Sequence, residues 1–359
     1  MPEKASATSV VVSTYDEKRW EDLAACADSL NQQRRTPLEV IIVVDHNPEL
    51  LERATLAFPH AQVVANQRSR GLAGARNTGI EVAMGEIVAF IDDDARAEKA
   101  WLGELEDCFS AAETVGAGGA LLPLWSGNPP GWFPREFYWV LGCSYTGLPE
   151  RLAPVRNPIG ANMAVRASIL KEVGGFREGS SAGAPRELRA RGVVRAGGNV
   201  PDDTDLAIRV KQARPGAVWL YQPHARVLHT VTAERASLGY FIRRSFEEGV
   251  GKASLAGLVG SDSGLSSERR HLAAVLPRGV LRGLKGLLRG DADAGLRAIA
   301  IVGGTAAAAA GFLSVALRRR ATLPVAAERT AMPTGSAASG APLPEQPSEA
   351  SGESPRRDN

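Results

Sequence analysis

Apolar residues in the first part of the chain gather in short uninterrupted runs, with longer segments of helical periodicity between them. The runs are typical of buried strands and occupy Ser9–Ser13, Val40–Val44, Gln62–Ala65 and Ile87–Ile91. Apolar residues recur at helical spacing in Lys18–Gln33, Pro48–Phe58 and Gly71–Met84. Strands without polar alternation that are separated by helices predict a parallel sheet covered on both faces. We therefore expect a doubly wound α/β fold for about the first 120 residues.

The pattern becomes less regular after Gly119. Trp125–Tyr145 is rich in Trp, Pro, Gly and Phe, which indicates a long loop or the wall of a pocket. Asn157–Val165 leads into the next predicted helix. Gly179–Asn199 has no periodicity, and its Gly and Ala content predicts a mobile loop. The remaining elements that we expect are helices at Ala167–Val173 and Pro201–Gln212 and closing strands at Ala217–Tyr221 and Ala225–Leu228.

The chain becomes helical and basic from Ala236. Ala298–Leu317 carries no charged residue and is long enough to span a membrane, although alanine and glycine dilute its hydrophobicity. Val275–Leu288 alternates Leu and Val with Arg and Lys, as interfacial helices do. We expect Ala298–Leu317 to lie on or dip into the membrane, or to form a hairpin with Val275–Leu288. A soluble helix packed on the core is the alternative.

Charge divides the chain more sharply than its overall composition does. The 359 residues carry a net charge of +2, and 44% of them are hydrophobic. This composition excludes a disulfide miniprotein, a wholly disordered chain and a polytopic membrane protein. The stretch from Arg235 to Arg320 holds 14 Lys and Arg against 6 Asp and Glu, a net charge of +8. We predict a catalytic domain at 1–235, a basic helical region at 236–320 that meets an anionic membrane surface, and a disordered low-complexity tail at 321–359.

The cysteines and the N-terminus indicate a cytoplasmic protein. Cys26, Cys108 and Cys143 are odd in number and widely spaced, which favours buried thiols in a reducing compartment. The first residues, Met1–Thr8, contain no apolar segment typical of a secretory signal. We therefore expect the chain in the cytoplasm, at the inner face of the cell membrane.

Acidic and polar residues follow the last apolar residue of three predicted strands. Thr14-Tyr15-Asp16 follows the first strand, Asp45 the second, and Asp92-Asp93-Asp94 the fourth. Ligands of open α/β sheets bind in the crevice at the carboxyl ends of the strands. Adjacent carboxylates repel each other unless a cation lies among them, and an Asp-x-Asp at a strand end can hold a divalent ion. A solvated acidic turn is the alternative.

Three further segments contain residue types that can do chemistry. Asp202–Asp205 opens a predicted helix, where one carboxylate is either a general base or part of an N-terminal cap. The glycines of Arg70–Asn77 allow the backbone to approach a phosphate. This segment lacks GK[ST] and does not follow the first strand, which excludes a P-loop and argues against nicotinamide binding. His229 follows an apolar run and is either a structural residue, the commoner case, or a ligand.

Six segments in this order resemble family 2 glycosyltransferases of the GT-A fold. The resemblance covers about Ser9 to Thr230. It rests on VVVSTYD (Val10–Asp16), VIIVVDHN (Val40–Asn47), RGLAGARNTGI (Arg70–Ile80), GEIVAFIDDDA (Gly85–Ala95), GANMAVR (Gly160–Arg166) and PDDTDLAIRV (Pro201–Val210). It implies an α/β GT-A fold with a doubly wound, mostly parallel sheet and helices on both faces, followed here by a C-terminal helical extension.

The resemblance also implies a role for each matching residue. Asp203 matches the catalytic base, and Asp94 would ligate Mg²⁺ or Mn²⁺ with support from His229. Asp202 occupies the acidic position before the base, beside the donor and acceptor pocket. The nucleotide side would be formed by Thr14, Tyr15, Asp45, Arg76, Asp92 and Asp93. The donor and acceptor side would be lined by Gly160, Ala161 and Asn162.

The chain departs from the family pattern at a few positions. Ser13 replaces a proline, Asp202 a glutamate, and His46 the second aspartate of the turn after the second strand. The Q-x-x-R-W motif of processive synthases is missing, which favours transfer of a single sugar. We therefore expect an inverting transferase that uses a UDP-, dTDP- or GDP-sugar.

The expected acceptor is a hydroxyl group, either lipid-linked or part of a cell-envelope glycan. A sugar-nucleotide nucleotidyltransferase and a non-catalytic membrane-associated module that binds nucleotide sugars are the alternatives. No nucleic acid is expected as a partner, because no reading motif accompanies the basic residues.

Overall fold

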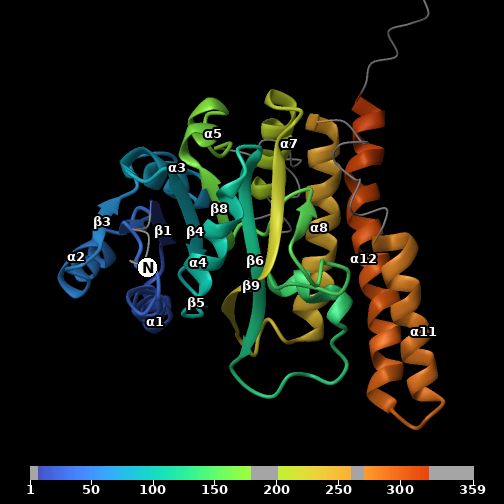
Figure 1. Cartoon of the computed structure of the whole chain (residues 1–359). Coiled ribbons are helices and arrows are strands. Elements are labelled where there is room, and N and C mark those ends of the chain that lie inside the picture. Colours follow the sequence, from blue (N-terminus) through green and yellow to red (C-terminus); the bar gives the residue numbers. More distant parts are fainter. Residues whose placement is uncertain (1–6, 179–200, 260–270, 323–359) are drawn as a thin grey trace, which may run out of the picture. The chain divides into compact units, whose positions relative to one another are not determined.

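The computed structural model describes residues 7–178, 201–259 and 271–322 (Figure 1). Residues up to Arg320 belong to one compact unit. The basic region that we expected from residue 236 therefore packs within the same unit as the α/β part. The expected loop Gly179–Asn199 lies outside the described residues. So does the expected tail, apart from residues 321 and 322.

A nine-stranded mixed sheet forms the centre of the described fold. The order along the sheet is β3-β2-β1-β4-β8-β6-β9-β5, with β7 paired to β9. The pairings place β1, β2, β3, β4, β6 and β9 in one direction and the other three strands against them, so the sheet is mostly parallel, as predicted. The four strands predicted first are β1 (Thr8–Thr14), β2 (Glu39–Val44), β3 (Gln62–Ala65) and β4 (Ile87–Asp92).

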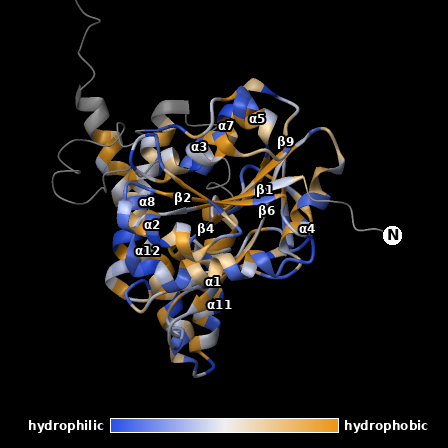
Figure 2. Cartoon of the chain, turned by 90° about the vertical axis from the view of Figure 1, so that its left-hand side faces the viewer, coloured by the Kyte–Doolittle hydropathy of each residue, from blue (hydrophilic) through white to orange (hydrophobic). Residues whose placement is uncertain are grey.

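Helices cover both faces of the sheet because both faces of its strands are apolar. Val10 and Val12 of β1 pack in one core cluster with Leu23, whereas Val11 packs in another with Ile80. The strands appear as a hydrophobic layer between helices of mixed character in Figure 2. The first face carries α1 (Trp20–Asn31, after the short η1, Glu17–Arg19), α2 (Pro48–Ala57) and α4 (Trp101–Glu106, continued by η2, Asp107–Ser110); the second carries α3 (Leu72–Val82), α5 (Ala167–Glu172) and α7 (Asp202–Ala213).

The second half of the sheet was predicted only in part. Its strands are β5 (Ala95–Ala97), β6 (Thr114–Trp125), β7 (Ala153–Val155), β8 (Asn162–Arg166) and β9 (Val218–Val231). The two closing strands predicted separately are one strand, β9, whose register against β6 shifts where Pro223 interrupts it. Proline lacks a backbone N–H and is tolerated at such an irregularity. The glycine-rich β6 lacked a strand signal because neighbours approach its backbone closely: a Cβ on Gly116 would lie 2.2 Å from Trp219.

Trp125–Tyr145, expected as a long loop or the wall of a pocket, is partly regular and contributes Arg135 and Glu136 to the lining of a cavity. It contains the end of β6 and the short helix η3 (Arg135–Leu141). Its aromatic rings pack on one another and on Phe241 of α8 (Leu238–Val259); the Phe133 and Phe241 ring centroids are 5.2 Å apart. This aromatic cluster joins the sheet to the C-terminal helices.

The C-terminal helices include the hairpin that the sequence offered as one arrangement. After the π-turn at His271–Val275, α11 (Leu276–Leu287) and α12 (Ala292–Thr322) lie side by side (orange and red in Figure 1). A Cβ on Gly283 would lie 2.6 Å from the Ala294 carbonyl oxygen, so glycine allows the two backbones to approach. The three cysteines are free and buried, as expected.

Candidate active site

The parallel register of the first strands brings the predicted polar residues to one edge of the sheet. Thr14 of β1 lies opposite Val44 of β2, and Ser13 lies opposite Asp92 of β4. Asp45 and the acidic triplet therefore follow neighbouring strand ends at the same edge of the sheet. This confirms the arrangement expected from the positions of the strands in the sequence.

Asp92, Asp94 and His229 form a group that fits a divalent metal ion. One ligand atom from each lies within 4.8 Å of the others. Two strands create the group: β5 begins directly after Asp94, and its Ala95 pairs with His229 of β9. Two carboxylates and an imidazole can accommodate Mn²⁺ or Mg²⁺ with coordination positions left for phosphate and water oxygens.

Positive charge surrounds the carboxylate of Asp94. His229 Nε2 is 3.2 Å from one carboxylate oxygen, and the guanidinium groups of Arg19 and Arg235 are 3.4 and 3.5 Å from the other. Burial alone would raise the pKa of Asp94, but the hydrogen bond and charge of His229, together with the two arginines, hold it far below its usual range. Burial favours the neutral form of His229, yet its hydrogen bond to Asp94 raises its pKa to about 10. These surroundings favour the ionised form of Asp94.

Asp203 lies at the first turn of α7 and faces the loop before β8. Its carboxylate accepts hydrogen bonds from the backbone N–H groups of Gly160 (3.1 Å) and Thr204 (2.6 Å). Asp203 is partly accessible to solvent, but protein surrounds its carboxylate closely enough for burial to raise its pKa. The charge of Asp202 raises it further, while Lys252 of α8 opposes the shift. Asp203 is thus oriented by the backbone and is more basic than an ordinary aspartate.

Arg76 connects the acidic triplet to the start of α7. Its guanidinium lies 3.2 Å from Asp92 and 3.0 Å from Asp202, and it donates to the Gly160 carbonyl oxygen at 3.1 Å. Arg76 is only 3% exposed. These contacts bring the metal-ligand group close to the start of α7, because Asp92 and Asp202 pair with one buried cation. Gly160, which accepts from Arg76, donates to Asp203.

Comparison with known proteins agrees with this geometry. Residues 9–174 match the model of glycosyl transferase family 2. The chain is 33% identical over 248 residues to the glucosyl-dolichyl phosphate glucuronosyltransferase of Haloferax volcanii, covering 68% of this chain and 75% of that protein. The chain belongs to glycosyl transferase family 2. The family resemblance read from the six sequence segments is therefore confirmed.

Two further similarities extend over most of this family 2 chain. The succinoglycan biosynthesis protein ExoM of Rhizobium meliloti is 25% identical over 322 residues, 80% of this chain and 96% of that protein. The solved mannosyltransferase PcManGT of Pyrobaculum calidifontis, in complex with GDP-Man and Mn²⁺, superposes with a TM-score of 0.51 at 18% identity, covering 87% and 88% of the two chains. At that identity the superposition supports the GT-A fold alone.

The turn after β2 of this glycosyltransferase is held by Asp45. One carboxylate oxygen accepts from Asn66 Nδ2 at 2.6 Å, and the other accepts from the Gly71 N–H at 2.9 Å. His46 adopts a left-handed backbone conformation (φ 51°), with its Nδ1 2.9 Å from Asp45. Both carboxylate oxygens thus have partners within the protein. Asp45 shapes the base-side turn, and a direct bond to the nucleotide stays a prediction.

Three predicted nucleotide contacts differ in exposure, and their roles stay predictions. Tyr15 is 51% exposed, so its ring is accessible for stacking on a base. Thr14 is 1% exposed and Asp93 2%, so both side chains lie inside the protein. Asp93 pairs with Arg19 at 2.6 Å, and burial raises its pKa to about 6 despite that pairing. Arg19 was missed, since no sequence pattern relates a helix start to an acidic turn more than 70 residues away.

Asn162, predicted to line the donor and acceptor pocket, has partners inside the protein, and its role in that pocket stays a prediction. Its side chain is fully buried, accepts from Trp101 Nε1 at 2.8 Å and donates to the carbonyl oxygens of Ala120 and Ala225. Every polar atom of the amide therefore has a partner, and the residue ties β8 to β6, β9 and α4. Ala161 is buried as well, so Gly160 is the member of this trio that reaches Asp203.

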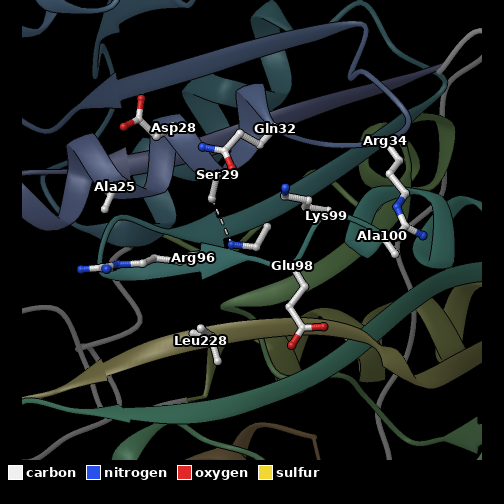
Figure 3. A pocket seen from close by; sticks show the side chains of 11 residues that line it. Ala25, Asp28, Ser29, Gln32, Arg34, Arg96, Glu98, Lys99, Ala100 and Leu228 are labelled. Atoms are coloured by element: carbon white, nitrogen blue, oxygen red, sulfur yellow. Dashed lines mark hydrogen bonds between the residues drawn. The ribbon is translucent and has the colours of Figure 1, made fainter.

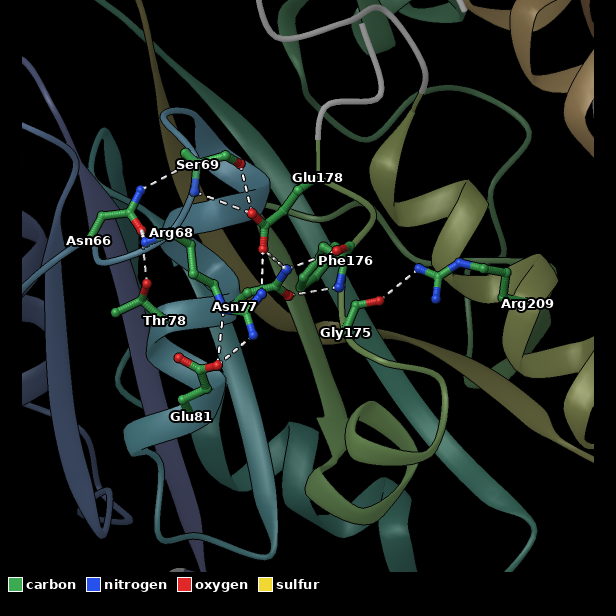
Figure 4. Close-up of polar contacts among 10 residues, drawn as sticks. All are labelled: Asn66, Arg68, Ser69, Asn77, Thr78, Glu81, Gly175, Phe176, Glu178 and Arg209. Carbon is green, nitrogen blue, oxygen red and sulfur yellow. Dashed lines mark hydrogen bonds and ion pairs between the residues drawn. The ribbon is translucent and has the colours of Figure 1, made fainter. Parts of the chain in front are cut away.

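A polar network that the sequence did not reveal supports the loop before α3 (Figure 4). Glu178 accepts hydrogen bonds from the Ser69 hydroxyl (2.7 Å), Asn77 Nδ2 (2.9 Å) and Arg68 (2.6 Å). Burial would raise the pKa of Glu178, but these donors lower it to about 2. The network fixes the segment after α5 against the glycine-containing loop whose Gly71 binds Asp45.

A cavity of about 560 Å³ lies beside the acidic cluster rather than at it (Figure 3). It is lined by residues of α1 and β5 and of the segments that follow them, and its charged lining residues are Asp28, Glu98, Arg34, Arg96 and Lys99. Arg19, at the other end of α1, is the part of this region that meets the acidic triplet. Three basic residues against two acidic ones leave the lining with a net charge of +1, and the cavity contributes no side chain to the metal-ligand group.

Proposed function

We propose that this glycosyltransferase moves one sugar from a nucleoside-diphosphate sugar to a hydroxyl group of a lipid-linked or envelope acceptor, with inversion at the anomeric carbon. The observation that carries the proposal is the double contact of Arg76 with Asp92 and Asp202. In the proposal the metal-ligand group faces the diphosphate and the general base Asp203 faces the acceptor. Arg76 holds these two parts of the site together. Two groups placed in this way suit a single in-line displacement.

In the proposed reaction Asp203 acts as the general base. Its carboxylate takes the proton of the acceptor hydroxyl while that oxygen forms a bond to the anomeric carbon. The bond from this carbon to the diphosphate oxygen breaks, and the electron pair leaves with the nucleoside diphosphate. The N–H groups of Gly160 and Thr204 keep the carboxylate oriented, and its raised pKa makes it a better proton acceptor.

Asp92, Asp94 and His229 are the residues that would hold Mg²⁺ or Mn²⁺. A divalent ion there would neutralise charge that develops on the leaving diphosphate. Arg19 and Arg235, which lie within 3.5 Å of Asp94, supply fixed positive charge to the same place. The presence of Mn²⁺ with GDP-Man in the mannosyltransferase of similar fold supports this proposal.

The lipid-linked acceptor is proposed from the relatives and from the C-terminal helices. The Haloferax volcanii relative is named for its use of a glucosyl-dolichyl phosphate. Within the described chain, Ala292–Leu317 of α12 is long and apolar enough to cross a membrane, and 33% of its most apolar 18-residue stretch is buried. Ile299 and Val302 are among its exposed residues. We place the chain in the cytoplasm, with these helices at the inner face of the cell membrane.

Membrane association has a direct test. Leu284→Glu combined with Ile299→Glu puts charge on exposed apolar faces of α11 and α12, where the native side chains are 47% and 69% exposed. Burying a leucine-sized side chain contributes ~1.5–3 kcal/mol, so the partition coefficient should fall at least ~10-fold. Cosedimentation with vesicles of anionic lipid measures it. Leu56→Glu, at a 78% exposed site on α2, is the matched control. Equal binding of all three proteins would contradict the membrane proposal.

The transfer proposal is tested by a donor panel. UDP-, dTDP- and GDP-sugars are each incubated with Mn²⁺ and a polyprenyl-phosphate glycoside, and the anomeric configuration of the product is read by NMR. We expect transfer from one nucleotide class, with inversion. Retention of configuration would contradict the single displacement. Nucleotide binding without turnover would favour the non-catalytic module, and pyrophosphate release from a nucleoside triphosphate and a sugar phosphate would favour a nucleotidyltransferase.

A further inference from the structure

A cavity of about 400 Å³ lies between η3 and the two helices α11 and α12. Three arginines line it, one from each element: Arg135, Arg282 and Arg297. Glu136 is its one acidic lining residue, and the hydroxyl-bearing Thr146 also contributes. Three positive charges against one negative charge leave the described lining with a net charge of +2.

The three arginines differ in the hydrogen bonds and ion pairs that they form within the protein. Arg282 pairs with the buried carboxylate of Glu136. Arg297 donates to the Gly131 carbonyl oxygen at 2.7 Å and to Asp291 at 2.9 Å, which leaves further N–H donors on its guanidinium. Arg135 is exposed, and within the described residues it has no ion-pair partner. Arginine presents a planar set of donors that matches the oxygens of a phosphate group.

The helix η3 links this cavity to the proposed catalytic centre. Arg135 is its first residue, and after its last residue, Leu141, the chain passes the metal-ligand group. A Cβ on Gly142 would lie 3.3 Å from the His229 ring, and Cys143 Sγ is 3.9 Å from His229 Nδ1. The helix is kinked at Phe137 (φ −112°, ψ 15°), so it consists of two short helical pieces and not one straight rod. The chain from Arg135 to Cys143 thus runs from the cavity lining to the surroundings of His229.

The outer side of the same helices is suited to a lipid surface. On α11, Leu281 and Leu284 are exposed, and Leu288 continues their stripe at helical spacing. Arg278 and Lys285 follow a parallel stripe, seven residues apart, as in helices that lie in an interface. The opposite side of α11, with Gly279 and Gly283, packs on η3 and α12 and lines the cavity. The cavity thus lies on the side of α11 opposite its apolar stripe, next to η3 and α12.

We propose that this cavity binds the phosphate group of the lipid-linked acceptor, so that its glycosyl hydroxyl extends along η3 toward Asp203. The proposal rests on the proposed function, because it assumes an acceptor that carries a phosphate between lipid and sugar. Arg135 and Arg297 provide the charged donors, and Arg282 adds charge while it remains paired with Glu136. The acceptor would then be selected by its phosphate as well as by its sugar.

The test compares two acceptors that differ only in the phosphate: a farnesyl-phosphate glycoside and a farnesyl glycoside without it. Arg135→Gln should raise KM for the phosphate acceptor about tenfold or more, as loss of one hydrogen bond to a charged group implies. Its kcat, its donor KM and its KM for the phosphate-free acceptor should stay unchanged. Arg278→Gln is the matched control, since it removes the same charge from the exposed surface of α11 outside the cavity lining. The Glu136→Gln, Arg282→Gln double variant should raise the same KM without leaving a buried carboxylate unpaired.

A binding measurement separates failure of this proposal from failure of the proposed function. Farnesyl phosphate, farnesol, inorganic phosphate and vesicles of anionic phospholipid are titrated into the full chain without donor. We expect Arg135→Gln to weaken farnesyl phosphate binding about tenfold and Arg278→Gln to leave it unchanged, whether or not transfer is detected. Equal losses in both variants would assign the effect to bulk membrane charge and overturn the proposal. Identical affinities for farnesyl phosphate and farnesol would also overturn the proposal. The same holds if Arg135→Gln weakens the binding of phospholipid vesicles and leaves the binding of farnesyl phosphate unchanged.

Discussion

Replacing Asp203 by asparagine should lower kcat by about 10²–10⁴-fold, the contribution expected of a general base. Asparagine has nearly the same shape and can still accept one of the hydrogen bonds from Gly160 and Thr204. It cannot take a proton from the acceptor hydroxyl. Single-turnover rates at saturating donor, with melting temperature as the check on folding, measure the effect. Turnover within a few fold of the native rate would remove Asp203 from the role of base.

The pH dependence of the same reaction provides an independent check. The pKa of Asp203 is raised by burial and by Asp202, so activity should be lost as pH falls through a value above the usual aspartate range near 4. Asp202→Asn removes a negative neighbour and should move this acidic limb to lower pH. Lys252→Gln removes a positive neighbour and should move it to higher pH. Shifts of kcat/KM profiles in the same direction, or no shift, would contradict the assignment.

Replacing Asp94 by asparagine should abolish the dependence of nucleotide binding on Mn²⁺ and lower turnover by at least ~10³-fold. A bound metal ion stabilises the transition state by several kcal/mol, and each ~1.4 kcal/mol is a factor of ten. Asparagine also removes the carboxylate that Arg235 faces, whereas Arg19 keeps its closer partner, Asp93. Thermal shift with UDP, dTDP and GDP, each with and without Mn²⁺, measures the binding.

Asp93→Asn is the matched control for this second prediction. Asp93 is the neighbour of Asp94, but its carboxylate points to Arg19 and lies outside the metal-ligand group. We expect this variant to keep a Mn²⁺-dependent rise in melting temperature with the same nucleotide. Loss of the rise in both variants would indicate that the charge of the acidic turn matters rather than ligation by Asp94. Unchanged nucleotide affinity in the Asp94 variant would contradict the metal assignment.

The first four strands and their helices were predictable because each depends on local sequence. Runs such as Val40–Val44 are apolar on both faces, which suits strands covered by helices on either side. The second half of the sheet was less predictable for a physical reason. In β6, glycine occupies positions where Trp219 and the Ala225 carbonyl oxygen approach, so its sequence reflects its neighbours and not strand propensity.

The candidate site was predictable where residues follow strand ends and not where distant segments meet. Asp45, Asp92 and Asp94 could be placed at one crevice because parallel strands end at the same edge. Burial was not predictable: Asn162 belongs to a family motif but is fully enclosed by β6, β9 and Trp101. A motif shows that a residue type is required, whereas the surrounding contacts decide whether it binds ligand or holds the fold.

By itself, the sequence determined the α/β class, the family resemblance, the acidic residues at the strand ends and the amphipathic character of the C-terminal helices. These features depend on residue types at short spacing. The tertiary structure alone decided that His229 meets Asp94, that Arg19 faces Asp93, and that Arg76 joins Asp92 to Asp202. It also brought Arg135 to α11 and α12. Such pairs are separated by up to about 160 residues, and no local pattern specifies them because they form only when the sheet and helices pack.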